Sequence, residues 1–209
     1  PEDPAFGALV EKKIFAVISA LNEMVHGFDF ARLLTVYYRA AVAGDDEKKT
    51  QVVRWFRGEY TTKSEAKADL GVNIIITDDD WYEYIKIFAV FLKKAGYNGM
   101  LVLVDELVNI YKIPNSITRQ YNYEKMLTMY NDTLQGVAQG LMIVLGGTPR
   151  FLEDSRRGLF SYEALRSRLA DARFAENGEM ELKNMMSPVI RLRRLSDNEL
   201  YALCLRLRA

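Results

Sequence analysis

The chain has 209 residues, of which 49% are hydrophobic and 27% are charged, which excludes global disorder and suits a domain with a sizeable core. Its formal net charge is zero, so whole-chain charge gives no argument for a nucleic-acid partner. A single cysteine excludes an intrachain disulfide, and no apolar run reaches the ~20 residues that span a bilayer. We therefore expect a cytoplasmic protein without a membrane partner.

The first seventy residues carry helical patterns and little else. Apolar residues recur at helical spacing in several segments, and glycines follow most of these segments as helix stops. Gly27 is expected to end the first helix, and Asp45-Asp46 to begin the third. The helices are predicted over 8–26, 30–43, 46–57 and 63–70.

The most informative stretch is Met100–Glu106, where five apolar residues run directly into two adjacent carboxylates. An uninterrupted apolar run of this length predicts a strand buried on both faces, as in a parallel sheet covered by helices. A helix predicted over 81–94 and a tight turn at 96–99 lead into this strand. Asp105 and Glu106 then emerge at its carboxyl end, where open α/β sheets bind their ligands.

This arrangement is typical of a Walker B strand. In that interpretation Asp105 holds Mg²⁺, directly or through water, and Glu106 orients and activates the water that attacks a γ-phosphate. The alternative is a buried strand followed by a helix whose first turn favours acidic residues. These residues alone leave both interpretations open.

A second buried strand is predicted over 141–145, after a helix predicted over 117–138. This strand ends in Gly-Gly-Thr-Pro. In nucleoside-triphosphate hydrolases with a Walker B glutamate, the next strand places a polar sensor beside the attacking water, and Thr148 is the candidate here. The alternative is a turn without chemistry.

The next segment, 150–169, is rich in arginine and carries a helix that Ser161 is expected to cap. Arginines near the end of this helix, Arg168 among them, suit its dipole. They also suit an arginine finger, which reaches a phosphate bound to a neighbouring subunit. Upstream, Arg119 and Tyr121 either reach a ligand or form a packed helix face.

Three further elements are expected in the C-terminal part. A loop of low hydrophobicity over 175–187 precedes a third strand candidate, 188–192. Ser196–Glu199 forms a capping box that opens a last helix over 200–207. Cys204 lies in the apolar pattern of that helix and is expected in the core rather than as a reactive thiol.

The order of these pieces resembles a bacterial P-loop family, the ATP-binding domain of bacteriophage-exclusion systems, formerly a P-loop domain of unknown function. The resemblance covers nearly the whole chain, and its most specific motif is Asp154–Leu169. Residues 188–207 look like the end of an AAA+-type core, where a strand ending in Arg-Leu precedes a helix. The other matching stretches are Val53–Gly58, Leu70–Val72, Gly96–Glu106, Asp132–Gly136 and Leu145–Pro149.

The resemblance implies an ATP-binding and ATP-hydrolysing domain whose cofactors are ATP and Mg²⁺. The implied fold is α/β, a partial AAA+-like P-loop core in which helices flank a parallel sheet. Arg168 stands roughly where related ATPases place a finger. Through the Walker B pair, the sensor and the family motif, the implied site residues are Asp105, Glu106, Thr148, Arg168, Arg157 and Arg156.

The family's Walker A motif should precede the first residue, and it is missing. The stretch Gly58–Ser64 is not a substitute, because it lacks the glycine before the lysine and is one residue short. We therefore expect the P-loop strand to be lacking and ATP binding by this chain alone to be weak. Residues 1–70 are expected to form a helical region, and residues 71–209 the Walker B and sensor part of the core.

The leading functional expectation is a nucleotide-driven switch or motor, as a homo-oligomer or with other subunits of a defence complex. The alternative is a non-hydrolysing interaction or scaffold module with the same kind of fold. Direct DNA binding is a weaker interpretation, since residues 150–209 carry twelve Lys/Arg against nine Asp/Glu. The adjacent Asp105 and Glu106 favour the ATPase, because a scaffold has little need for two carboxylates at a strand end.

Overall fold

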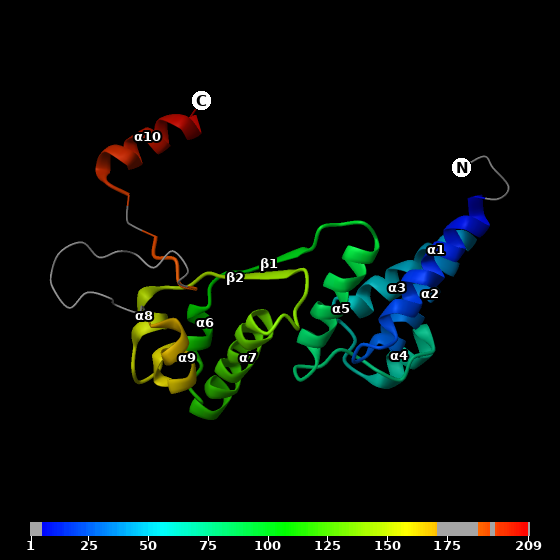
Figure 1. Cartoon of the computed structure of the whole chain (residues 1–209), viewed down its shortest axis with the longest axis horizontal. Coiled ribbons are helices and arrows are strands. Elements are labelled where there is room, and N and C mark those ends of the chain that lie inside the picture. The colour runs from blue at the N-terminus through cyan, green and yellow to red at the C-terminus, as the bar shows by residue number, and fades with distance from the viewer. Residues whose placement is uncertain (1–5, 171–187, 193–194, 209) are drawn as a thin grey trace. The chain divides into compact units, whose positions relative to one another are not determined.

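The computed structural model describes residues 6–170, 188–192 and 195–208. Most of these residues are helical, and two strands form a parallel sheet (Figure 1), in keeping with the expected α/β class. The chain divides into two compact units. Unit 1 holds the described residues of 1–107 and 128–147, and unit 2 holds those of 108–127 and 148–209.

Unit 1 begins with a helical region whose helix ends carry recognisable caps. The Asp45 carboxylate accepts a hydrogen bond from the first turn of α3, and the Thr62 hydroxyl does the same for α4. Gly44 and Gly71 end α2 and α4 in the left-handed conformation. The helices are α1 (Phe6–Leu21), α2 (Gly27–Ala43), α3 (Asp46–Phe56), α4 (Lys63–Leu70) and α5 (Trp81–Lys94).

The junction between α1 and α2 differs from the prediction. The first helix ends at Leu21 instead of residue 26, and Gly27 is the first residue of α2 instead of a helix stop. A Cβ at position 27 would lie 1.8 Å from the carbonyl oxygen of Leu21. Gly27 is therefore required by the close approach of two backbone segments, which the local pattern does not reveal.

Aromatic and aliphatic side chains from all five helices, α1 to α5, pack together in the core of unit 1. Residues 72–77, which follow α4 and are rich in β-branched side chains, form no strand. Val72 is buried there, and the Ile74 carbonyl accepts a 2.9 Å hydrogen bond from Trp55 Nε1. The expected boundary at residue 70 remains a prediction about domain organisation. The buried members of this core are Leu21, Phe30, Leu33, Val52, Trp55, Tyr60, Ala66, Leu70, Val72, Tyr84 and Ile87.

The sheet consists of β1 (Met100–Val104) and β2 (Leu141–Leu145), which pair in parallel with Met100 opposite Leu141. Side chains of α5 and of one face of the sheet pack together, with Leu141 buried beside Ala89. The prediction of strands buried on both faces is wrong, because the opposite face is exposed in the part of the chain that the structure describes. Its exposed fractions are 57% for Leu101, 70% for Leu103, 63% for Met142 and 43% for Val144.

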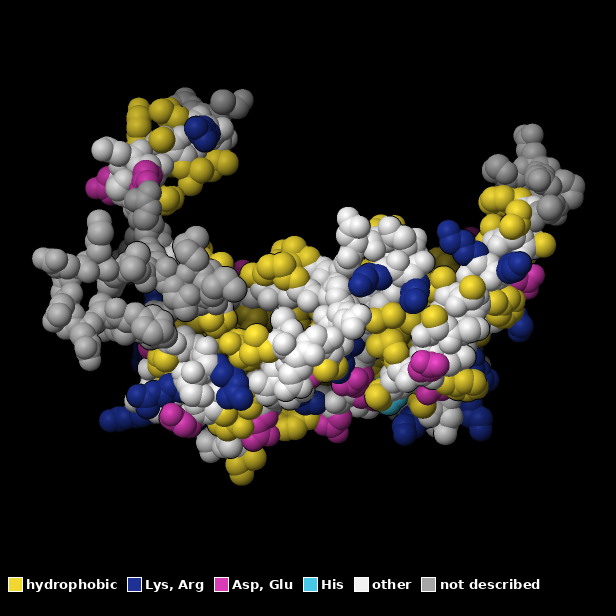
Figure 2. All heavy atoms as spheres, in the orientation of Figure 1, with side chains coloured by type: hydrophobic (Ala, Val, Ile, Leu, Met, Phe, Trp, Pro, Cys, Tyr) yellow, Lys and Arg dark blue, Asp and Glu magenta, His cyan; other side chains and the backbone are white. Residues whose placement is uncertain are grey.

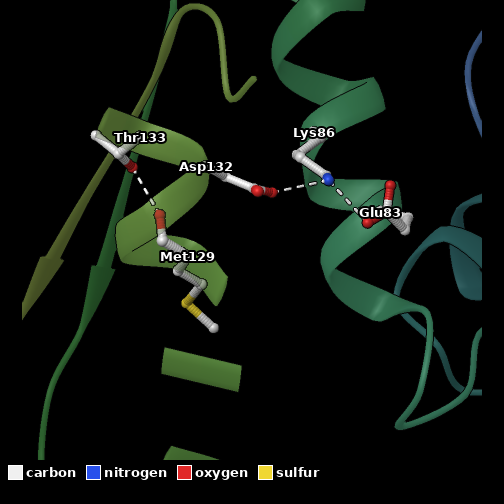
Figure 3. Close-up of polar contacts among 5 residues, drawn as sticks. All are labelled: Glu83, Lys86, Met129, Asp132 and Thr133. Carbon is white, nitrogen blue, oxygen red and sulfur yellow. Dashed lines mark hydrogen bonds and ion pairs between the residues drawn. The ribbon is translucent and has the colours of Figure 1, made fainter. Parts of the chain in front are cut away.

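An ion-pair network fixes α5 against the C-terminal part of α7 (Ser116–Leu134) within unit 1. Figure 3 shows Lys86 between two carboxylates, with its Nζ 2.7 Å from Glu83 and 3.0 Å from Asp132. Burial lowers the pKa of Lys86, but hydrogen bonds to the two carboxylates outweigh it and raise the pKa above its ordinary value. The side chains of Lys86 and Asp132 are only 11% and 16% exposed, so this pair is largely removed from water.

Unit 2 is built from short helices around a small core. Tyr123 of α7 and Phe151 pack with ring centroids 6.3 Å apart, and both side chains are buried. The helix predicted over 117–138 ends early, at Leu134. Besides the first part of α7, the elements of unit 2 are α6 (Val108–Lys112), α8 (Pro149–Glu153), η1 (Leu159–Ser161), α9 (Glu163–Leu169) and α10 (Asp197–Arg208).

The C-terminal predictions have mixed outcomes. The capping box is confirmed, because the Ser196 N–H donates to Glu199 and the Glu199 N–H donates to the Ser196 hydroxyl. The prediction of a third strand is wrong, since residues 188–192 form no strand. The expectation for Ser161 is wrong too, because Tyr162 precedes α9 and the Ser161 hydroxyl donates to the Gly158 carbonyl.

The prediction of a buried Cys204 is also wrong. The side chain is exposed, as are Leu200, Leu203 and Leu205 of α10, and Figure 2 shows hydrophobic side chains open to solvent around this helix. An amphipathic pattern predicts an apolar face but not what covers it. The loop predicted over 175–187 lies outside the described residues.

Candidate functional site

The two carboxylates that follow β1 lie at the end of this strand, and both side chains are exposed. Glu106 has a φ of 56°, in the left-handed region that residues with a Cβ rarely adopt. Its backbone N–H donates a 2.7 Å hydrogen bond to Asp105 Oδ1. Unfavourable backbone conformations of this kind concentrate at functional sites, so the geometry marks this turn as a candidate.

The neighbouring strand end contributes Gly146, which the sequence patterns did not single out. Its N–H donates to the Val104 carbonyl at 2.7 Å, and its own carbonyl accepts from the Leu107 N–H at 3.1 Å. A Cβ at position 146 would lie 2.8 Å from Asp105 Oδ1. The absence of a side chain at Gly146 therefore leaves the space that the Asp105 carboxylate occupies.

The donor set at this turn fits Mg²⁺. Carboxylate oxygens are hard ligands, and Mg²⁺ is usually bound through one or two carboxylates together with substrate phosphates and water. Asp105 is the carboxylate available for this role, and Glu106 is a second one beside it. Within the described ranges no group of three metal-ligating side chains occurs, so a cage made only of protein ligands is not what this site offers.

Thr148, the expected sensor, belongs to unit 2 and caps a helix. Its hydroxyl accepts a 3.3 Å hydrogen bond from the Phe151 N–H at the start of α8. The side chain is exposed. The structure thus gives Thr148 a capping role, and its sensor role stays a prediction.

The three expected arginines occupy different surroundings within unit 2. Arg157 Nη2 donates to the carbonyls of Tyr111 and Ile113, both at 3.1 Å, so it holds the turn after α6. Arg168 donates from Nη1 to the Ala164 carbonyl one turn back in α9. Arg156 is exposed, and only its backbone N–H is engaged, with Asp154. Arg156 is therefore the one of these three with an exposed guanidinium that makes no hydrogen bond among the described residues.

This part of unit 2 is organised by Tyr111, which the sequence patterns do not single out, and by Asp154, the first residue of the family motif. The Tyr111 hydroxyl donates to Asp154 Oδ2 at 2.8 Å, and the guanidinium carbons of Arg150 and Arg157 lie 5.5 and 5.4 Å from the Tyr111 ring centroid. Asp154 Oδ1 accepts from the N–H groups of Arg156 and Arg157. The Asp-Ser-Arg-Arg-Gly sequence is the local signal for this turn, because Asp commonly bonds backbone N–H groups just after it.

The structure therefore brings Asp105, Glu106 and Gly146 together in unit 1, and Arg156 and Arg157 together on one turn of unit 2. No described helix is both long and apolar enough to cross a membrane.

Comparison with known proteins gives a single finding. No curated protein and no solved structure matches the chain. The family described as "BREX system ATP-binding protein BrxC/D" matches residues 1–209, which confirms the resemblance to the ATP-binding proteins of bacteriophage-exclusion systems. The chain therefore belongs to the BrxC/D family of BREX system ATP-binding proteins.

Proposed function

We propose that this chain supplies the Walker B part of an AAA+-like ATPase that works as a nucleotide-driven switch or motor in phage defence. One observation carries the proposal: the Asp105–Glu106 pair at the end of β1, with Glu106 held at a φ of 56° and its N–H on the Asp105 carboxylate. Membership of an ATP-binding family supports the nucleotide as the ligand.

In this proposal Asp105 holds Mg²⁺, which neutralises charge on the phosphates of ATP when it is bound. The hydrogen bond from the Glu106 N–H orients the Asp105 carboxylate, and Gly146 leaves room for it. Glu106 accepts the proton of the attacking water, since its carboxylate is exposed beside the metal ligand. The pair thus divides metal binding and base catalysis between two adjacent side chains.

The remaining site residues are assigned to contacts between copies or subunits. Arg168 and Arg156 are the proposed finger candidates, because cationic side chains stabilise charge on the transferring phosphoryl group. Arg157 has a supporting role, since its guanidinium bonds two carbonyls. Thr148 is proposed as the sensor, which requires its hydroxyl to serve the water as well as the helix cap.

ATP turnover by the natural full-length protein tests the proposal. Glu106→Gln should lower kcat by about 10²- to 10⁴-fold, the usual contribution of a positioned general base, while ATP affinity is retained. Glu47→Gln is the matched control, because Glu47 is an exposed glutamate in the first turn of α3 and should leave turnover unchanged.

The opposite result supports the scaffold alternative. If the unmodified protein and both variants turn over ATP at the same measurable rate, Glu106 is not the catalytic base. If the unmodified protein shows no ATP turnover and the Glu106→Gln variant is indistinguishable from it, the carboxylate pair is structural. The chain would then act as a non-hydrolysing interaction module.

A further inference from the structure

Unit 2 contains a polar pocket of about 230 Å³ whose lining shares only Arg156 with the residues of the proposed ATPase function. Its lining comes from the first turns of α7 and from the segment between α8 and α9, and no carboxylate is among the lining side chains. This volume lies below the roughly 300–1,000 Å³ of pockets for drug-sized ligands, so the pocket suits one small chemical group. The lining residues are Ser116, Arg119, Gln120, Tyr123, Arg156, Ser161 and Tyr162.

Arg119 is the unusual member of this lining. Its side chain is charged at any physiological pH, yet the residue is only 8% exposed. Its Nη1 donates a 2.8 Å hydrogen bond to the Ile113 carbonyl, and no ion pair joins it to a carboxylate among the described residues. A buried charge is as a rule paired, because its lost hydration must be replaced.

A second guanidinium adds to this positive charge that no carboxylate neutralises among the described residues. Arg157 Nη2 donates to the same Ile113 carbonyl at 3.1 Å, and Arg157 Nε is buried without a hydrogen-bond partner among the described residues. Two guanidinium groups therefore converge on one carbonyl oxygen. Burial raises the pKa of the Tyr123 hydroxyl, and the nearby charges of Arg119 and Arg157 oppose that rise.

The nearby carboxylate does not neutralise this charge. Asp154 is occupied by the Tyr111 hydroxyl and two backbone N–H groups, and no ion pair joins it to Arg156 among the described residues. Arg156, which is exposed, is among the lining residues of the pocket. The pocket is thus lined by two arginines that have no carboxylate partner among the described residues, and a third arginine, Arg157, shares the Ile113 carbonyl with Arg119.

We propose that this pocket binds a dianionic phosphate group. A phosphate that is free or at the end of a chain carries about −1.5 to −2 charge near pH 7, which matches two unpaired guanidinium groups better than a carboxylate does. Guanidinium groups also bind phosphate oxygens in a forked geometry. Arg119 and Arg156 are the charged ligands, and the exposed Ser116 hydroxyl is a neutral donor beside them.

Calorimetric titration of the purified chain with inorganic phosphate tests this site, without Mg²⁺ and with chloride keeping the ionic strength constant. We expect saturable binding that strengthens between pH 5.5 and 7.5, as phosphate gains its second charge near pH 6 to 7. Arg156→Ala should weaken it by about 10- to 100-fold, the usual effect of losing a charge-assisted hydrogen bond. Arg166→Ala, which removes an exposed arginine of α9 outside the pocket, should leave it unchanged.

Arg119→Gln should abolish phosphate binding. If this substitution of a buried residue prevents folding, the Arg156→Ala variant still tests the site, because Arg156 is exposed. The proposal is overturned if phosphate gives no saturable signal beyond that of chloride, or if Arg156→Ala and Arg166→Ala behave alike. If ADP competes with inorganic phosphate, the natural ligand of the pocket is the terminal phosphate of a nucleotide. If ADP does not compete, the natural ligand is free phosphate. Glu106→Gln should bind phosphate normally; loss of binding in that variant would place the phosphate at the ATPase centre instead.

Discussion

At the scale of single residues, the Asp154 carboxylate accepts hydrogen bonds from three groups at once. It accepts one hydrogen bond from the Tyr111 hydroxyl, 43 positions earlier, and two from the N–H groups that follow it. The hydrogen bond from Tyr111 and then those from the backbone hold the pKa of this carboxyl below its ordinary value. The ionised form of Asp154 therefore stabilises the folded state.

The sign of this effect sets a pH window. Because the folded-state pKa is lowered, the stabilisation is present above the unfolded-state pKa, near 3.9, and is lost as the pH falls through the lower folded-state value. The melting temperatures of the unmodified chain and Asp154→Asn should differ by a constant amount from pH 7 to 5 and converge below about pH 4. A difference that stays constant down to pH 2.5 would contradict this account.

Gly146 is the second residue whose role can be tested by itself. Gly146→Ala places a Cβ 2.8 Å from Asp105 Oδ1, so the flexible carboxylate must move while the backbone can stay. We expect the ATPase rate of the full-length protein to fall by up to about 100-fold, as for other small misplacements of catalytic groups. Gly7→Ala is the control, because its Cβ would meet nothing within 4 Å. Equal rates in the two variants would show that the position of Asp105 does not matter.

At the scale of elements, the sequence predicts what is encoded locally. The bounds of α5 agree at both ends, because an acidic start, an apolar face and Lys93-Lys94 before Gly96 all lie within one stretch. The same holds for the strand part of Met100–Glu106 and its carboxylates. The part of the candidate site that lies in one stretch was therefore predictable.

The errors come from contacts between distant residues. A strand at 188–192 would need a pairing partner, which its own residues do not specify. Gly27 and Gly146 are set by close approaches to Leu21 and Asp105, which no local pattern encodes. The hydrogen bond from Tyr111 to Asp154 joins residues 43 positions apart, so no local pattern encodes it either.

The ion pair between Lys86 of α5 and Asp132 of α7 gives a prediction at this scale. Lys86→Met should lower the free energy of unfolding by about 1–3 kcal/mol, because it leaves Glu83 and Asp132 close together in a largely buried setting. Urea unfolding measures this, and a double-mutant cycle with Asp132→Asn should show coupling of about 0.5–3 kcal/mol.

Lys49→Met is the matched control for that cycle. Lys49 pairs with Asp46 at the surface, where the Asp46 side chain is 87% exposed, so its loss should change the free energy of unfolding far less than the loss of Lys86. Purely additive effects of Lys86→Met and Asp132→Asn would show that the network does not couple the two helices.

At the scale of the whole molecule, the residues of the two proposals lie in different units, except for the arginines that both proposals place in unit 2. Unit 1 carries the carboxylate pair on a sheet of two strands, and unit 2 carries the arginines of the family motif and the proposed phosphate pocket. The exposed apolar residues of β1, β2 and α10 are surfaces on which further protein can pack. In these two proposals, the carboxylates of unit 1 act on ATP, and the pocket of unit 2 binds a phosphate group.

The most direct test of the central claim is the identity of the nucleotide that the full-length protein retains. After incubation with ATP and Mg²⁺ and rapid removal of free nucleotide, the bound fraction is separated by chromatography. If Glu106 is the catalytic base, the Glu106→Gln variant should retain intact ATP, whereas the unmodified protein should retain ADP. Bound ADP in both proteins, in equal amounts, would contradict the role assigned to the carboxylate pair.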